Sequence, residues 1–449
     1  MNVLLIAYEF PPLNSGGSHR PYRIASHLPR SGIRPIVVTP EASGHGEGNI
    51  DPSLGGDSDE RMTVVRTPLD PKGPTYDLHA TYYLHIVDPA ARRWMHHLRP
   101  TIERIHREHR LDAILLTAPP FSLARPCARI AKDLGLPFIL DLRDGWSHWI
   151  VTPYASYLHY RLTLREERLA LESADAIVAT SDQTITDLKS LHPHIAADRF
   201  HLITNSYAGD VPEIPERITM RTPTVAEPLR IGYVGSFYYT PYQRALMFSP
   251  WYRKKPHQFL QYAPRKEDWR YRSPHFFFKA LAALRMKRPE LAGLVRIELA
   301  GHVPAWLRDM VQEHDLMDLV VFHGRLGHRE ALALQARCDA LLITSSKVIG
   351  GQDYSIAGKT FEYFQALRPI LAFVSEGAQK RILQRSGLGL LCPPDDLSAS
   401  VLVIERMLHG GIELRPDADF IRSMHSSVMA ERFATVIRAV SGRRTKVIV

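Results

Sequence analysis

Short hydrophobic runs recur along the first half of the chain, and segments with a helix-like mixture of apolar and polar residues separate them. The runs that we interpret as strands are 3–7, 35–39, 63–66, 113–117, 137–141 and 176–180. The segments that we interpret as helices are 18–28, a long region that ends at 110, 120–134 and about 157–173. Strands that alternate with helices in this way predict a parallel sheet of the α/β class.

A second series of the same kind follows a proline-rich, strand-free stretch at 209–230, which is typical of a linker. Its strands are expected at 229–234, 295–300, 320–322, 340–344, 369–374 and 389–391. The chain has 449 residues, which is more than one hydrophobic core usually supports. We therefore predict two doubly wound domains in tandem, the first at 1–210 and the second at 225–419.

An irregular segment at about 238–275 interrupts the second series with aromatic residues, prolines and basic residues. Aromatic rings can stack on bases while Arg and Lys contact phosphates, so nucleic-acid binding is one alternative for this segment. No recognisable nucleic-acid-binding motif accompanies it. We expect an inserted lid or arm and no nucleic-acid partner.

The composition, 45% hydrophobic and 23% charged, is that of a soluble globular protein. No apolar stretch approaches the roughly 18 to 20 residues that cross a bilayer, and a strand rather than a basic signal peptide follows Met1, so we expect a cytoplasmic protein. Cys127, Cys338 and Cys392 are widely spaced among apolar residues. We interpret them as buried thiols, not as metal ligands or disulfides.

The formal net charge of +9 and the pI of about 9.4 favour an acidic partner, namely nucleic acid, an anionic lipid or a phosphorylated small molecule, and charge alone does not choose among them. Basic residues are densest at 92–110, where Trp94, Met95, Leu98, Ile102 and Ile105 are mixed among them. Such a helix could lie on an anionic membrane as a peripheral contact. The alternative is an ordinary amphipathic helix with a solvated polar face.

The loop "YEFPPLNSGGSHR" (8–20) follows the first predicted strand, and ligands of open parallel sheets bind where strands end. Gly16 and Gly17 permit close approach of the main chain to a ligand, and the positive end of the following helix suits a phosphate. Arg20 and Arg23 on that helix would add fixed charge, with Arg20 nearer the cleft. A tight turn with surface arginines is the structural alternative.

Motifs along nearly the whole chain resemble family-4 glycosyltransferases of the GT-B fold. After the opening loop come "PFILDLRDGW" (137–146), "ADAIVATSDQTITDLKS" (174–190), "ITNSYAGD" (203–210), "RIGYVGSFY" (230–238), "VVFHGRLGHREALALQARCDALLITS" (320–345) and "GKTFEYFQALRPILAF" (358–373). They occur in the order found in that family. The resemblance implies two Rossmann-like domains facing a cleft, with a C-terminal helix at about 420–449 that returns to the N-terminal domain.

The resemblance also implies a reaction. Such enzymes bind a nucleotide-diphosphate sugar mainly with the C-terminal domain and the acceptor mainly with the N-terminal one. They transfer the sugar to a hydroxyl with retention of configuration and without a metal or other cofactor. We expect a glycan or lipid-linked acceptor, as in the synthesis of surface polysaccharides.

Residues of the C-terminal domain match the family's donor site in part. Glu362 corresponds to the glutamate that accepts hydrogen bonds from the ribose hydroxyls, and Lys359 and Thr360 are expected at the diphosphate. Tyr354 stands eight residues before Glu362, where the family carries another glutamate, with Asp353 beside it. The loop 348–359, with Gly350 and Gly351, is expected to wrap the sugar.

Further diphosphate contacts are expected at Gly235 and Ser236, after the first strand of the second domain. Relatives supply Arg and Lys a few residues later, where this chain has its insertion. Arg244, Arg272 and Arg325 are therefore candidates to replace them. On the N-terminal side, Arg143 and Asp144 follow a strand at the cleft and are expected to contact acceptor or sugar.

These residues define the expected site. Arg143, Asp144, Lys359 and Glu362 form its catalytic group, and Asp141 and Asp144 are too few for a metal site. Two other functions stay open: a nucleotide-sugar epimerase or hydrolase, for which His19, His302 and His323 are candidates, and a non-catalytic nucleotide-sugar-binding protein, which the missing glutamate favours.

Overall fold

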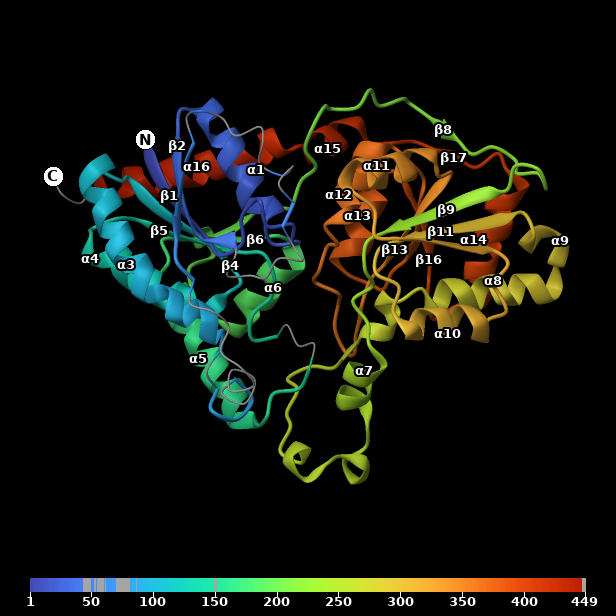
Figure 1. Ribbon diagram of the computed structural model, residues 1–449, viewed down its shortest axis with the longest axis horizontal. Coiled ribbons are helices and arrows are strands. Elements are labelled where there is room, and N and C mark those ends of the chain that lie inside the picture. Colours follow the sequence, from blue (N-terminus) through green and yellow to red (C-terminus); the bar gives the residue numbers. More distant parts are fainter. Residues whose placement is uncertain are drawn as a thin grey trace.

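The computed structural model describes residues 1–42, 50–51, 54, 60, 62–69, 81–85, 87–148 and 152–445. Two lobes lie side by side, each built on a parallel sheet with helices on both faces (Figure 1). The predicted fold class, two Rossmann-like α/β domains, is confirmed.

The N-terminal lobe has a seven-stranded sheet in the order β3-β2-β1-β4-β5-β6-β7. Every neighbouring pair is parallel, and Leu4 of β1 lies between Ile36 and Ile114. The strands are β1 (Asn2–Ala7), β2 (Arg34–Pro40), β3 (Thr63–Thr67), β4 (Ala113–Ala118), β5 (Phe138–Leu142), β6 (Ala176–Ala179) and β7 (Phe200–Leu202). The helices are α1 (His19–His27), α3 (Pro89–His109), α4 (Ala124–Asp133), α5 (Tyr157–Ser173) and α6 (Asp182–Leu191).

The C-terminal lobe has a six-stranded parallel sheet in the order β12-β11-β9-β13-β15-β16. Its strands are β9 (Leu229–Val234), β11 (Val295–Ala300), β12 (Val320–Gly324), β13 (Ala340–Thr344), β15 (Ile370–Phe373) and β16 (Gly389–Cys392). Its helices are α8 (His275–Lys287), α9 (Pro289–Ala292), α10 (Ala305–Glu313), α11 (His328–Arg337), α12 (Lys359–Ala366), α13 (Ala378–Ser386) and α14 (Leu397–His409).

The chain ends against the N-terminal lobe. After α15 (Ala418–Arg422), helix α16 (Ser426–Thr445) lies across one face of the first sheet (Figure 1). Its buried Phe433 and Ile437 share a core with Val3 and Leu5 of β1. The helix expected at about 420–449 thus consists of two pieces, and its last residues, 446–449, lie outside the described part of the chain.

The chain passes from one lobe to the other twice, near Tyr207 and near His425, and main-chain hydrogen bonds join these two segments. Tyr207 and His425 form a parallel bridge, in which Tyr207 N–H donates to the Met424 carbonyl and Ser426 N–H donates to the Tyr207 carbonyl. The stretch predicted to be strand-free contains β8 (Ile218–Thr219), which pairs with β17 (Glu413–Leu414). A two-residue ladder is too short to leave a hydrophobic pattern in the sequence.

Helix α3, predicted as a possible membrane contact, turns its apolar side into the protein. Trp94, Leu98, Ile102 and Ile105 are at most 1% exposed and belong to the core under the first sheet. These side chains are therefore not available for insertion into a bilayer, and the amphipathic-helix alternative holds.

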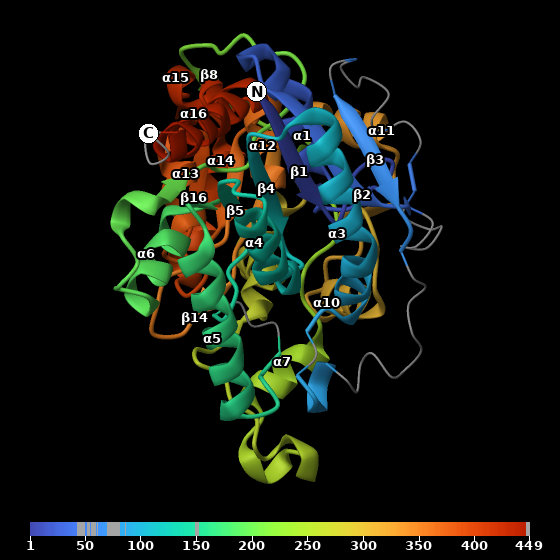
Figure 2. The same cartoon turned by 90° about the vertical axis from the view of Figure 1, so that its left-hand side faces the viewer.

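The insertion is an arm that reaches from the C-terminal lobe to the N-terminal one (Figures 1 and 2). It contains α7 (Pro241–Phe248), two short 3₁₀ turns (Trp251–Arg253 and Pro256–Gln258), β10 (Glu267–Asp268) and a third turn (Trp269–Arg272). Strand β10 pairs with β14 (Lys347–Val348) of its own lobe.

The far side of this arm is bonded to the N-terminal lobe. Tyr262 exchanges two main-chain hydrogen bonds with Tyr154, of 2.9 and 3.0 Å. The arm therefore connects the lobes at a second place. In Figure 1, α7 of the arm lies at the opposite end of the molecule from α15, which directly precedes the crossing at His425.

The three cysteines are free and buried, as expected. Among the described residues, no helix is both long and apolar enough to cross a membrane.

Candidate functional site

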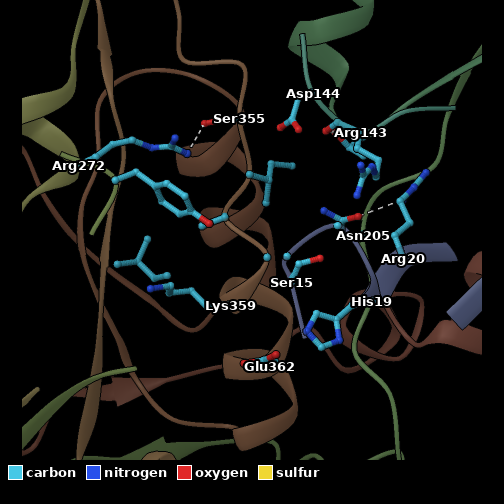
Figure 3. Close-up of a pocket in the computed structure, with 18 of the residues that line it drawn as sticks. Ser15, His19, Arg20, Arg143, Asp144, Asn205, Arg272, Ser355, Lys359 and Glu362 are labelled. Atoms are coloured by element: carbon cyan, nitrogen blue, oxygen red, sulfur yellow. Dashed lines mark hydrogen bonds between the residues drawn. The ribbon is translucent and has the colours of Figure 1, made fainter. Parts of the chain in front are cut away.

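A cavity of about 780 Å³ lies between the lobes and is lined by loops from both (Figure 3). The N-terminal lobe contributes the segments that follow β1, β4, β5 and β6, and the C-terminal lobe contributes those that follow β9 and β13. The carboxyl ends of both sheets therefore face this space, which has the size of a small-molecule site.

The glycine pair before α1 lies close to side chains of both lobes. A Cβ at Gly17 would lie 1.5 Å from Glu9 Oε2 and 2.3 Å from Arg143 Nη1, so a side chain there would force the ends of these two side chains to move. For Gly16, the nearest atom to such a Cβ is the Tyr238 hydroxyl of the other lobe, at 3.9 Å. The loop thus brings main-chain groups to the middle of the cleft.

Arg20 lies beside the cavity, but its guanidinium is bound within the N-terminal lobe. It is 4% exposed and donates to both carboxylate oxygens of Asp141, with the shortest distance 2.7 Å, and to the carbonyls of Ile203 and Thr204. The sequence predicted that Arg20 contacts the donor. In the structure, its N–H groups instead donate to these residues of its own lobe. Arg20 joins α1 to the ends of β5 and β7.

Lys359, the first residue of α12, places its ammonium in the cavity wall. Its Nζ is buried, has no hydrogen-bond partner among the described residues, and lies 3.4 Å from the centroid of the Tyr233 ring. Burial lowers the pKa of Lys359 to about 7, and nearby Glu362 offsets only part of that effect. A cation of this kind gains much from an anionic ligand.

Glu362 lies one turn further along α12 and lines the same cavity. The guanidinium of Arg23, on α1 of the opposite lobe, interacts electrostatically with it and donates to the Ser206 carbonyl. Thr360, by contrast, points away from the cavity, because its hydroxyl is buried against Gln379 at 3.2 Å. Lys359 and Glu362 thus both line the cavity, whereas Thr360 does not.

Tyr354, in the loop before α12, occupies the position at which the family carries another glutamate. Tyr354 lines the cavity, and the Arg265 guanidinium of the insertion stacks on its ring at 4.3 Å. Beside them Glu267 is buried, 3.3 Å from Arg265, and burial raises the pKa of Glu267 to about 7. Asp353 is also buried, and Ser346 and Ser355 donate to it at 3.1 Å.

Arg265 and Glu267 are therefore parts of this region that the sequence analysis did not single out. The signal that could have found them is the pair of opposite charges, two residues apart, in an otherwise basic segment.

Arg272 is the cation that the insertion supplies to the cavity. It donates to Ser355 Oγ at 2.9 Å and stacks on Trp269 at 4.8 Å and on Tyr238 at 5.6 Å. The other two arginine candidates lie elsewhere: Arg244 pairs with Asp268 at 2.9 Å, and Arg325 is exposed outside the cavity.

Besides Thr360 and Arg325, three more predicted donor contacts are not in the cavity wall. Gly235 packs under Lys359, whose Nζ would be 3.2 Å from a Cβ there, and Ser236 is exposed. Gly351 is exposed on the far part of its loop, next to Val348. Gly235 thus leaves room for the Lys359 side chain. Its φ of 114° is a second reason for glycine at this position.

Arg143 and Asp144 line the cavity opposite Arg272 (Figure 3). Arg143 donates to the Pro119 carbonyl at 2.6 Å and lies 3.7 Å from Glu9. Burial raises the pKa of Asp144 above its usual value, while Arg143 and Arg272 oppose that shift.

Of the three candidate histidines, His19 lines the cavity, and His302 and His323 do not. His323 is instead 2.5 Å from Glu298 in the second sheet. Among the described residues, no group of three His, Cys, Asp or Glu side chains is close enough to hold a metal ion.

Comparisons with known proteins bear on the fold and the family. Residues 15–206 match the family model described as "Glycosyl transferase 4-like domain". A probable glycosyltransferase, WbjE of Pseudomonas aeruginosa, is 29% identical over 142 residues, which cover 29% of this chain and 34% of the relative. The match thus spans about a third of that relative's length.

Solved structures resemble the whole chain. Sucrose-phosphate synthase from Thermosynechococcus elongatus superposes with a TM-score of 0.54 at 14% identity, covering 100% of this chain and 98% of that one. HepE from Anabaena, in complex with UDP and glucose, has a TM-score of 0.53 at 15% identity, with coverage of 100% and 99%. Likeness at this identity shows the shared fold, which is GT-B. The match over residues 15–206 and the shared GT-B fold thus confirm the resemblance of this chain to the family-4 glycosyltransferases.

Proposed function

We propose that this chain is a glycosyltransferase that moves a sugar from a nucleotide-diphosphate sugar to a hydroxyl of a glycan or lipid-linked acceptor, with retention of configuration. The family match and the fold support this class of reaction. Synthesis of a surface polysaccharide or another glycoconjugate is the process that we propose it serves.

One observation carries the proposal. The Lys359 ammonium is buried without a partner among the described residues, at the N-terminus of a helix that faces the glycine loop of the other lobe. A helix N-terminus and an unpaired cation both favour a diphosphate. Lys359 and Arg272 together would balance much of the donor's negative charge, so the proposal requires no metal ion.

The reaction follows from this charge arrangement. The bond between the anomeric carbon and the phosphate oxygen breaks, and its electron pair stays on the leaving nucleoside diphosphate. The acceptor oxygen forms the new bond to that carbon, and its proton passes to the departing phosphate oxygen. Fixed cations that stabilise the leaving group lower the barrier, since charge develops there.

The remaining roles follow from the positions of the residues. Glu362 would accept the ribose hydroxyls of the donor, because its two oxygens can accept two donors at once. Arg143 and Asp144, on the opposite wall, would contact the sugar or the acceptor. HepE was solved with UDP and glucose, so UDP-linked sugars are the first donors to test.

The test incubates the protein with a panel of UDP-linked and GDP-linked sugars and follows release of nucleoside diphosphate with and without candidate acceptors. Release that requires an acceptor supports the proposal, and NMR of the product's anomeric linkage tests retention. Turnover without acceptor would indicate an epimerase or hydrolase. Donor binding without turnover, across all acceptors, would indicate a non-catalytic protein.

A further inference from the structure

The tip of the insertion exposes large apolar side chains. Trp251 and Leu260 are each 75% exposed, Tyr252 is 66% exposed and Phe259 is 57% exposed. We call these four residues the tip surface. The arm that carries them projects beyond the sheets of both lobes (Figures 1 and 2). Several large apolar side chains that gather on a projecting element mark an interaction surface.

The tip surface is embedded in positive charge. Arg253, Lys254 and Lys255 lie between its residues, and the whole stretch 237–266 contains no Asp or Glu. No acidic side chain in the described part of the chain forms an ion pair with any of these three cations. Burial and the charge of Lys266 both lower the pKa of Lys254, so the cations repel one another.

The start of α5 extends this surface onto the N-terminal lobe. Tyr157 and Leu158 are 53% and 63% exposed. The Tyr157 ring packs edge-on against Tyr262 of the insertion, with centroids 4.9 Å apart. Both lobes therefore present apolar side chains at this end of the molecule, and the hydrogen bonds between Tyr154 and Tyr262 fix their relative position.

We propose that the tip surface docks on the headgroup region of a bilayer that contains anionic lipids. Tyr and Trp side chains favour the membrane interface, and unpaired Lys and Arg beside them attract anionic headgroups. The complementary charge is what selects a lipid surface over a second copy of this chain, whose tip would carry the same positive charge. This surface differs from the one predicted on α3, whose apolar residues are buried.

The tip surface and part of the cavity wall belong to the same segment of the chain. The insertion begins with Tyr238 and Tyr239 and ends with Trp269 and Arg272, and all four side chains line the cavity. A bilayer held at the tip would therefore contact the segment that also forms part of the cavity wall. The docking itself does not depend on the proposed transferase activity, since it needs neither donor nor acceptor.

Sedimentation of the full chain with lipid vesicles tests this inference. Wild-type protein should bind vesicles of phosphatidylcholine mixed with phosphatidylglycerol, bind vesicles of pure phosphatidylcholine far less, and release as salt is raised. The triple variant Arg253→Gln/Lys254→Gln/Lys255→Gln should lower the affinity at least about tenfold. A control with the same charge change on exposed cations at the end of α3, directly after it and on α4, Arg107→Gln/Arg110→Gln/Lys132→Gln, should bind like the wild type.

A second set of variants tests the apolar residues of the tip surface. Trp251→Ser/Phe259→Ser should weaken binding, while Met286→Ser, at a side chain that is 89% exposed on α8, should not. All variants should keep the wild-type melting temperature, because every replaced side chain is at least partly exposed. In addition, Trp251 emission, obtained as the difference between wild type and Trp251→Phe, should shift to shorter wavelength on anionic vesicles.

Three results would overturn the inference. One is equal binding to both vesicle types, and another is binding that the charge variant leaves unchanged. The third is a wild-type protein that does not bind vesicles but forms a dimer, when Trp251→Ser/Phe259→Ser dissociates that dimer. This result would show that the tip surface binds a second copy of the chain.

Discussion

Arg265 Nη1 lies 2.8 Å from Asp187 Oδ2, and this ion pair joins the insertion of one lobe to α6 of the other. The same guanidinium donates to the His148 carbonyl at 3.1 Å. It also lies 3.3 Å from Glu267 and over the Tyr354 ring of its own lobe. Arg265 thus contacts residues on both walls of the cleft and links the arm to the N-terminal lobe.

Replacement of Arg265 by leucine should loosen the lobes and destabilise the protein. The substitution removes the pair with Asp187 and leaves Glu267 buried without its cation, which should cost about 2 kcal/mol in the free energy of urea unfolding at neutral pH. The radius of gyration from small-angle X-ray scattering should increase as well. Arg253→Leu, in the same segment but exposed, is the control, and equal effects of both variants would contradict the role of Arg265.

Stability should depend on pH through Glu267. Its pKa in the folded protein, about 7, is above the ordinary value of 4.5, so the folded state binds a proton more tightly than the unfolded one. This carboxyl therefore makes the protein less stable as pH rises from 4.5 through 7. Glu267→Gln should match the wild type at pH 4.5 and exceed it by up to about 3 kcal/mol at pH 8. A constant difference across that range would refute the assignment.

Donor affinity should fall as pH rises above 7 because of Lys359. Below its pKa of about 7, the ammonium is already charged when the donor binds. Above that pH, binding must take up a proton, and affinity should decrease up to about tenfold per pH unit. Calorimetry in buffers of different ionisation enthalpy measures this uptake. Lys359→Arg stays charged and should flatten the profile, so an unchanged slope in that variant would exclude Lys359 as its source.

Glu362→Gln should weaken donor binding about tenfold without affecting the fold, since a carboxamide has a single acceptor oxygen for the ribose hydroxyls. Titration of a nucleotide sugar, followed by calorimetry, gives the affinity. Glu376→Gln, near the start of the next helix and outside the cavity, is the matched control. Wild-type affinity in Glu362→Gln would remove Glu362 from the donor site.

Arg20 should act on stability rather than on the donor. Asp141→Asn removes the charge that its buried guanidinium needs and should cost about 3 kcal/mol or more in unfolding free energy. Thermal melting and donor titration of the same variant separate the two roles. A variant that melts like the wild type but loses donor affinity would restore Arg20 as a ligand contact.

The alternation of hydrophobic runs and helical segments predicted the strands of both sheets except β7, because most of those strands are largely buried and mostly apolar. Strand β7 has only three residues and is partly exposed at the edge of its sheet, so it leaves no such run. The glycine loop and the start of α12 were also found, since a motif keeps its residues together in the sequence. Contacts between segments that are distant in the sequence were not predicted. Arg20 and Asp141 are 121 positions apart, and nothing in their neighbours in sequence predicts that they pair.

The environment of Tyr354 was missed for a related reason. Its partners Arg265 and Glu267 belong to an insertion that has no regular periodicity, so its path could not be traced from pattern. The apolar residues of the helix at 92–110 were recognised, but a sequence does not tell whether such a stripe faces a core or a lipid. The buried positions of Trp94 and Leu98 decide that question.

The bridge between Tyr207 and His425 has a mechanical consequence. Both covalent connections between the lobes pass through it, so it is the natural pivot for any change in the width of the cleft. The insertion meets the N-terminal lobe at the opposite end, where leverage about that pivot is greatest. The hydrogen bonds between Tyr154 and Tyr262 and the ion pair between Arg265 and Asp187 act there, so a small number of contacts limits how far the cleft can open.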